Sequence, residues 1–67
     1  MRRFFFNLHG AQNTNDPAGL LYAGDLEAFR AAQRLARDLS TARPQLRGNT
    51  CVVIAKKEID DLYFISI

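Results

Sequence analysis

The sequence contains a single cysteine, Cys51, and this scarcity limits how a chain of 67 residues can be stabilised. A disulfide within the chain needs two cysteines, so none can form. A lone cysteine also fits a reducing compartment better than a secreted protein. A chain of this length makes one small domain, 1–67, which buries only about 60% of the surface of its unfolded form. We therefore expect its stability to come from a helix packed tightly on a sheet, or from oligomerisation.

Patterns of metal-ligating and catalytic residues are also scarce. The chain has one histidine, His9, no zinc-type spacing and no glycine-rich phosphate loop. The acidic residues in 58–61 match no calcium loop. A nucleophile and base could come only from Cys51 and His9, and the apolar residues 52–54 predict a buried, inert thiol. We therefore expect no enzymatic activity, no metal and no cofactor.

Long apolar runs and a strong net charge are absent as well. No stretch approaches the roughly 20 apolar residues of a membrane span. Arg2 and Arg3 precede an apolar run that lacks the features of a signal peptide. The formal net charge of +2 permits a nucleic-acid partner without arguing for one. These absences predict a soluble cytoplasmic protein that makes no membrane contact.

The segments that are present have clear periodicity. Short apolar and β-branched runs are typical of strands, and one segment repeats apolar residues at the three- and four-residue spacing of a helix. The expected strands are 3–9, 20–23, 50–55 and 62–67, and the expected helix runs from 26 to 42. The order ββαββ predicts an α+β domain, with a mainly antiparallel sheet and one helix packed on one face.

Local residue choices mark the ends of these segments. Asp25 is the expected N-cap, because its carboxylate can accept the free N–H groups of the first helical turn. Pro44 disfavours helical geometry before it, so the helix should end near Ala42. The stretch DPAG at 16–19 fits a type I turn. A polar hairpin connection is expected at 56–61.

Three consecutive phenylalanines, Phe4 to Phe6, raise the question of where the middle ring lies. Alternate residues of a strand share a face, so Phe5 lies opposite the other two. The later strands are also apolar on both faces, and a single helix covers only one. We expect Phe4 and Phe6 to lie under the helix. The sequence pattern equally allows the opposite arrangement, with Phe5 under the helix. The expected second apolar surface, a possible interaction surface, combines Phe5, Val53, Tyr63 and Ile65.

An exposed apolar patch of this kind usually marks an interaction site, and several occupants compete for it. Our first choice is a homodimer, packed sheet on sheet or paired edge to edge through terminal strands. Another protein or a hydrophobic ligand comes next, followed by nucleic-acid bases stacked on exposed aromatic rings. In the remaining alternative, sheet twist and loop 10–19 cover the face and nothing binds there.

The helix carries a charged face that includes Arg30, Arg34 and Arg37. Arginines one turn apart can contact phosphates, which makes a nucleic-acid-binding module the alternative function. The simpler interpretation is a solvated face with the ion pairs Glu27–Arg30 and Arg34–Asp38.

The stretches RFFFNLH, DPAG and GDLEAFRAAQRLARDL resemble the small bacterial family called domain of unknown function 6894. Its members open with an arginine–aromatic stretch, continue with an Asp-x-x-Gly turn and begin their helix with Asp-Leu/Ala-x-Ala-Arg. The residues on this pattern are Arg3 to His9, Asp16, Gly19, Asp25, Leu26, Ala28 and Arg30. The C-terminal part departs from it, with no tryptophan and with KKEIDD as the last turn.

The resemblance covers almost the whole chain. It implies a bacterial, soluble, stand-alone domain and transfers no catalytic residue. We predict a non-enzymatic module that associates with itself or with another protein through an apolar sheet face or a sheet edge.

Overall fold

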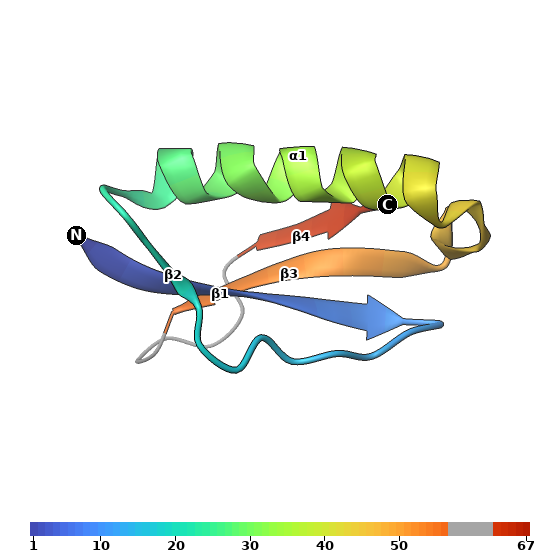
Figure 1. The fold of residues 1–67 in the computed structure, drawn as a ribbon, viewed down its shortest axis with the longest axis horizontal. Coiled ribbons are helices and arrows are strands. Elements are labelled where there is room, and N and C mark those ends of the chain that lie inside the picture. The colour runs from blue at the N-terminus through green and yellow to red at the C-terminus, as the bar shows by residue number, and fades with distance from the viewer. Residues whose placement is uncertain (57–62) are drawn as a thin grey trace.

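The computed structural model describes residues 1–56 and 63–67. Its elements are β1 (Arg2–Gly10), β2 (Leu20–Tyr22), α1 (Asp25–Ala42), the 3₁₀ helix η1 (Pro44–Leu46), β3 (Thr50–Lys56) and β4 (Tyr63–Ser66). The predicted α+β class and the order ββαββ are confirmed (Figure 1). Of the predicted connection 56–61, Lys56 belongs to β3 and the rest lies outside the described residues, as does Leu62.

The strands form one antiparallel sheet in the order β2-β1-β3-β4. The central strands β1 and β3 pair from Phe4–Lys56 to Gly10–Thr50. On either side of them lie β2, with 3 residues, and β4, with 4 residues. Because β2 pairs only with the start of β1, most of that edge of β1 has no partner strand. At the opposite edge, β4 pairs with β3 on one side, and no strand among the described residues pairs with its other side.

Helix α1 packs along one face of the sheet (Figure 1). It presents Ala28, Ala32 and Ala36 to the sheet, and all three are buried. Residues four apart lie on one side of a helix, so this row of small side chains brings the helix backbone close to the strands. The larger buried side chains come from the sheet and include Phe4, Val52 and Ile54.

The start of α1 differs from the prediction. Gly24 is the N-cap, and no side chain caps the helix. Asp25 is instead the first helical residue, and its carboxylate accepts a charged hydrogen bond from the Lys56 ammonium at 2.9 Å. Glu27 accepts a hydrogen bond from the Ala23 N–H at 3.3 Å. Asp25 was wrongly predicted as the cap because a partner from β3, distant in the sequence, holds its carboxylate.

The predicted end of α1 is confirmed at Ala42. The Arg43 N–H donates to the Leu39 carbonyl at 2.7 Å, and Pro44 opens η1 directly afterwards. Proline suits the first turn of a new helix, because its missing N–H would have no partner there.

The three phenylalanines divide as the alternation predicts. Phe4 is buried under α1, and both Phe4 and Phe6 pack against the Tyr22 ring, with centroid distances of 6.1 and 5.8 Å. Phe5 pairs with Ala55 across the strands, on the face away from the helix. Helix packing therefore accounts for Phe4 and Phe6 and leaves Phe5 on the other side of the sheet.

The predicted grouping of Phe5, Val53, Tyr63 and Ile65 on one face is wrong. Tyr63 lies opposite Ile54 and Ile65 opposite Val52, so both belong to the helix side of the sheet. Val53 does lie on the far side but is fully buried. The register places Phe64 opposite Val53 instead. Both parities of the last strand are apolar, so the alternation pattern does not determine this register.

The close approach of β1 and β3 at Gly10 generates a stability prediction. Gly10 has a φ of 133°, and a Cβ there would lie 2.1 Å from the backbone oxygen of Asn49. We expect Gly10→Ala to lower the free energy of unfolding by about 3 kcal/mol or more, through backbone displacement and strain. Urea unfolding followed by far-UV circular dichroism measures this change.

Gly24→Ala is the matched control, because a Cβ at Gly24 meets nothing within 4 Å. We expect this variant to lose less than about 1 kcal/mol. Equal losses in the two variants would contradict the proposed close contact at Gly10.

Candidate functional site

The free part of the β1 edge is covered by loop 10–19. Leu8 and Thr14 exchange both backbone hydrogen bonds, at 2.8 and 3.0 Å. The Phe6 N–H donates to the Asp16 carboxylate at 3.3 Å, and the Asn7 side-chain oxygen accepts the Asp16 N–H at 2.8 Å. Backbone and side-chain groups of the loop therefore take the place of a neighbouring strand, which prevents another chain from pairing here.

The Asp16 carboxylate anchors this loop. It accepts hydrogen bonds from the N–H groups of Gly19, Phe6 and Ala18, at 3.0, 3.3 and 3.2 Å. Burial raises the pKa of Asp16, but these three donors together outweigh burial and lower the pKa below its ordinary value. The predicted turn residue Asp16 thus joins its own turn to β1.

The opposite edge of the sheet, β4, has a different character. The Ile67 N–H donates to the Thr50 carbonyl at 3.0 Å. Along an antiparallel pair of strands, residues that form backbone hydrogen bonds to the neighbouring strand alternate with residues that do not. Since Ile67 bonds to β3, Ser66 and Phe64 are residues of the second kind, and their N–H and C=O groups point away from β3. The strand YFIS has no charged residue and no proline. Its Tyr63 and Phe64 side chains are 40% and 61% exposed.

A groove lies between β4 and the adjacent flank of α1. It is a shallow groove of about 340 Å³ that is largely open to solvent. Its lining residues are Gln33, Ala36, Arg37 and Ser40 from the helix, and Ile65, Ser66 and Ile67 from the end of the chain. Near the start of the helix, Phe29 packs on the Tyr63 ring with centroids 5.5 Å apart. A bare strand edge and an adjoining groove therefore occur together.

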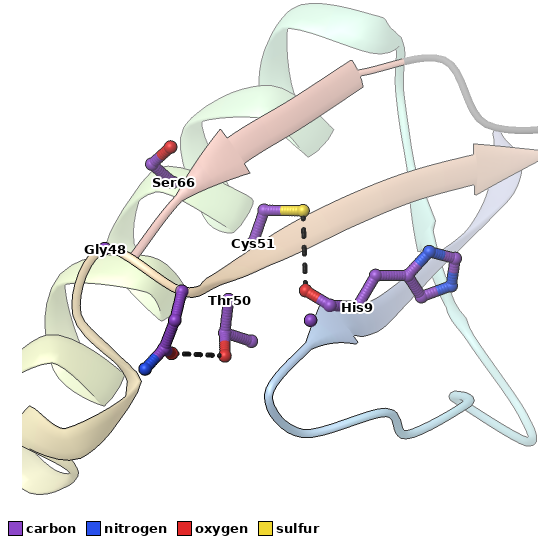
Figure 2. A pocket seen from close by; sticks show the side chains of 7 residues that line it. His9, Gly48, Thr50, Cys51 and Ser66 are labelled. Carbon is purple, nitrogen blue, oxygen red and sulfur yellow. Dashed lines mark hydrogen bonds between the residues drawn. The ribbon is translucent and has the colours of Figure 1, made fainter.

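A second hollow, of about 400 Å³, lies where β1 ends and β3 begins (Figure 2). Its wall includes His9 of β1, Cys51 of β3 and Ser66 of β4, which are direct neighbours across the sheet. The Cys51 Sγ donates a hydrogen bond to the His9 carbonyl at 3.6 Å, and Figure 2 shows the imidazole turned away from the sulfur. The thiol and the imidazole are therefore neighbours without the contact that a nucleophile and base require.

The arginines of the predicted phosphate-contacting face, Arg30, Arg34 and Arg37, are all exposed. The expected ion pairs Glu27–Arg30 and Arg34–Asp38 do not form. Lys56–Asp25 is the single salt bridge within residues 1–56 and 63–67. The three guanidinium groups thus have no carboxylate partner in the part of the chain that the structure describes.

Two further arginines hold local structure instead. Arg43 donates to the Gln12 side chain at 3.0 Å, which ties the end of the helix to loop 10–19. Arg47 donates to the carbonyl and the hydroxyl of Ser40, at 2.8 and 2.9 Å.

The sequence-predicted surface and the structure thus differ in which residues they bring together. Phe5 is half-buried beside Gly19, where a Cβ would lie 3.0 Å from its ring. Ile65 lines the groove beside the helix, and Tyr63 packs on Phe29 of α1. Phe64 and Ser66, which were not among the predicted residues, supply the outer edge of β4. The sequence does contain a feature that indicates this edge, because residues 63–66 form a run without a charged side chain.

A metal site and a membrane-spanning helix are both absent from the described part of the chain. No three histidine, cysteine or acidic side chains of residues 1–56 and 63–67 gather into a potential metal site. No helix among the same residues combines the length and the apolar character needed to cross a membrane.

Comparison with known proteins relates residues 3–58 to one family. The model of a family described as Domain of unknown function (DUF6894) matches this range, as the sequence resemblance predicts. No curated protein and no solved structure matches the chain. The matched range contains loop 10–19 and α1 and ends before β4.

The anchoring role of Asp16 generates a pH-dependent prediction. We expect Asp16→Asn to lower the free energy of unfolding at neutral pH by about 1–3 kcal/mol, because an amide cannot accept three N–H groups as a carboxylate does. The folded-state pKa is lowered, so this stabilisation is complete above the unfolded-state pKa of about 4 and is lost as the pH falls through the folded-state value. Urea unfolding at neutral and acidic pH measures both effects.

The control is Asp38→Asn, which removes an equal charge from an exposed helix position. We expect it to change stability by less than about 0.5 kcal/mol. A loss at Asp16→Asn that stayed constant down to the lowest pH would contradict a role for the ionised carboxylate.

Proposed function

The chain belongs to the family described as Domain of unknown function (DUF6894), and because this description names no activity, we propose a function from the chain's own surface. It is a non-enzymatic protein-interaction module of the cytoplasm that accepts an added β-strand at the open edge of β4. The uncharged outer edge of β4, which pairs with no strand of residues 1–56 and carries exposed Tyr63 and Phe64, is the observation that carries the proposal.

Strand addition suits this edge for two physical reasons. The outward N–H and C=O groups of Phe64 and Ser66 can each pair with an incoming backbone, and a typical net hydrogen bond contributes about 0.5–1.5 kcal/mol. The Phe64 and Tyr63 side chains add apolar surface that a partner strand would cover. Recognition by an added strand combines these two contributions, with affinity from the backbone and specificity from alternate side chains.

Other surfaces of the sheet are less suited to a partner. The free edge of β1 is occupied by Thr14 and Asp16 of loop 10–19. On the face away from the helix, Val53 and Ala55 are already buried, so little apolar surface remains at the centre of that face. This contrast favours edge pairing over packing of sheet on sheet.

The added strand comes from another protein or from a second copy of this chain. Two copies of β4 can pair antiparallel about a two-fold axis, which would join two sheets into one and make a homodimer. The same backbone groups would serve either occupant, so one variant tests both.

Ser66→Pro is the variant that tests strand addition. Proline removes an N–H that faces away from β3, and it is tolerated at such positions of edge strands. We expect the variant to remain folded and to lose association, measured in two ways. Light scattering on a sizing column across a range of concentrations detects pairing with a second copy, and fluorescence anisotropy detects binding of a labelled peptide, Thr-Val-Gln-Val-Gln-Val-Thr.

Ser66→Ala is the matched control, because it removes the hydroxyl and keeps the N–H. It should associate like the unmodified chain. Association that survives Ser66→Pro, or none in either assay with the unmodified chain, would refute the proposed function.

Nucleic-acid binding by α1 is the second candidate, and the exposure of Arg30, Arg34 and Arg37 favours it. Their charge is not neutralised by an ion pair within residues 1–56 and 63–67. Three arginines along one side of the helix can contact successive phosphates.

This candidate predicts binding of a single-stranded RNA oligonucleotide that weakens with salt. Three phosphate contacts correspond to a slope of about −2 in log affinity against log salt concentration. Changing Arg30, Arg34 and Arg37 together to glutamate should abolish binding, whereas changing them to lysine, which keeps the charge, should preserve most of it. Equal affinities for the two triple variants, measured by anisotropy, would eliminate this helix face as the binding surface.

A further inference from the structure

We propose that the strand-addition site at β4 selects an extended peptide with acidic side chains, which pair with Arg37 and Arg30 on the adjoining flank of α1. The inference rests on the proposed function and specifies its partner. It follows from three features: the groove beside β4, the distribution of charge around α1, and the geometry of an added strand.

The groove places Arg37 beside the strand edge. Gln33, Arg37 and Ser40 line it from the helix, and Ile65 and Ser66 line it from the strand. A strand added to β4 would run along this groove, with every second side chain directed to the helix side of the sheet. Those side chains would therefore approach the polar groups that α1 presents.

Arg30 belongs to the same flank of the helix. It stands two turns before Arg37, about 10.5 Å along the axis and only about 20° around it. It follows Phe29, whose ring packs on Tyr63 of the edge strand. The two arginines thus lie beside β4 over much of its length. Alternate side chains of an added strand would be about 6.6–6.8 Å apart, so more than one of them would lie near an arginine.

The carboxylates of α1 lie elsewhere. At about 100° per residue, Glu27 and Asp38 are about 80–100° further around the helix from Arg37, away from the groove. Asp25 is directed to Lys56 at the start of the helix. The flank over β4 therefore carries positive charge and no acidic residue of α1, which complements an acidic strand.

The same charges disfavour a second copy as the occupant. Pairing two copies of β4 in one continuous sheet requires a two-fold axis perpendicular to the sheet, which puts both helices on one face. The flanks that carry Arg30 and Arg37 would then face each other, and like charges across an interface oppose binding. Residues Tyr63–Ser66 supply no carboxylate to offset this repulsion.

Arginine pairs well with carboxylates because its guanidinium donates two parallel hydrogen bonds to the two oxygens. The exposed position of Arg37 limits the gain from each pair. We therefore expect a modest preference for acidic peptides that depends on salt, added to an affinity that comes from the backbone and from Tyr63 and Phe64.

The experiment compares labelled peptides that differ only in charge. Fluorescence anisotropy measures the dissociation constants of Thr-Val-Glu-Val-Glu-Val-Thr, of its glutamine counterpart and of its lysine counterpart. We expect the glutamate peptide to bind about threefold to tenfold more tightly than the glutamine peptide at low salt, from two exposed ion pairs. The lysine peptide should bind most weakly, and high salt should reduce these differences.

Variants of α1 identify the groups that select charge. Arg37→Gln, and more fully Arg37→Gln with Arg30→Gln, should bring the glutamate and glutamine peptides to equal affinity without changing the affinity for the glutamine peptide. Arg34→Gln is the matched control, because Arg34 points about 60° further from the groove than Arg37. It removes the same charge and should leave the preference intact.

The outcomes separate this inference from the proposed function. Equal binding of the glutamate and glutamine peptides, with loss of both in Ser66→Pro, would overturn the acidic preference and leave strand addition standing. A preference that Arg34→Gln reduces as much as Arg37→Gln would overturn the assignment to the groove. A chain that binds none of the peptides but forms a dimer sensitive to Ser66→Pro would show that the occupant is a second copy. Absence of both peptide binding and self-association would refute the inference together with the proposed function.

Discussion

The pairing of β1 with β3 is the interaction on which the rest of this small domain depends. It joins the beginning of the chain to a segment that follows the helix, from Phe4–Lys56 to Gly10–Thr50. Such distant segments pair only after a large loop-closure entropy has been overcome. The pair provides Phe4, Val52 and Ile54 for the helix to cover, and both flanking strands are attached to it. The close backbone approach at Gly10 defines one end of the pair.

The two sides of this central pair are completed in opposite ways. Beside β1, a loop of polar residues satisfies the backbone groups that the short β2 leaves free, chiefly through Thr14 and Asp16. Beside β3, the strand β4 adds a new edge and ends there, with uncharged residues along it. Soluble proteins usually protect such edges with charges, prolines or a covering segment. Loop 10–19 thus protects one edge of the sheet, whereas β4 lacks these forms of protection among the described residues, which is why the proposed function is placed at β4.

Periodicity predicted the parts of this fold that depend on local patterns. The ββαββ order follows from the periodicity of the segments, and the helix end at Ala42 follows from Pro44. Alternation separates Phe5 from Phe4 and Phe6, but the structure decides that Phe4 and Phe6 are the pair under the helix. The register of β4 did not follow, because apolar residues fill both of its faces and every register buries some of them. Tyr63 and Ile65 were therefore predicted on the far face, where the structure has Phe64.

Contacts between distant residues account for the other differences. Asp25 has the chemistry of an N-cap, but Lys56 offers it a charged partner, which a local pattern cannot reveal. Asp16 was predicted as a turn former, and its bond to the Phe6 N–H, ten residues earlier in the chain, makes it part of the sheet edge as well. The candidate binding site has the same origin. Its groove exists only because α1 and β4 are brought side by side, so composition alone reveals its arginines but not their neighbours.

An open edge also links association to stability. A partner that binds the folded chain and not the unfolded one raises the free energy of unfolding, by about 2.7 kcal/mol at a hundredfold excess over the dissociation constant. For a chain with a small core, this is a large share of a total stability of a few kcal/mol. A strand added to β4 would give its outward Phe64 and Ser66 groups partners and cover Tyr63, whose ring packs on Phe29 of the helix. Binding at the edge would thus reinforce the contact between helix and sheet, because Tyr63, which an added strand would cover, also packs on the helix.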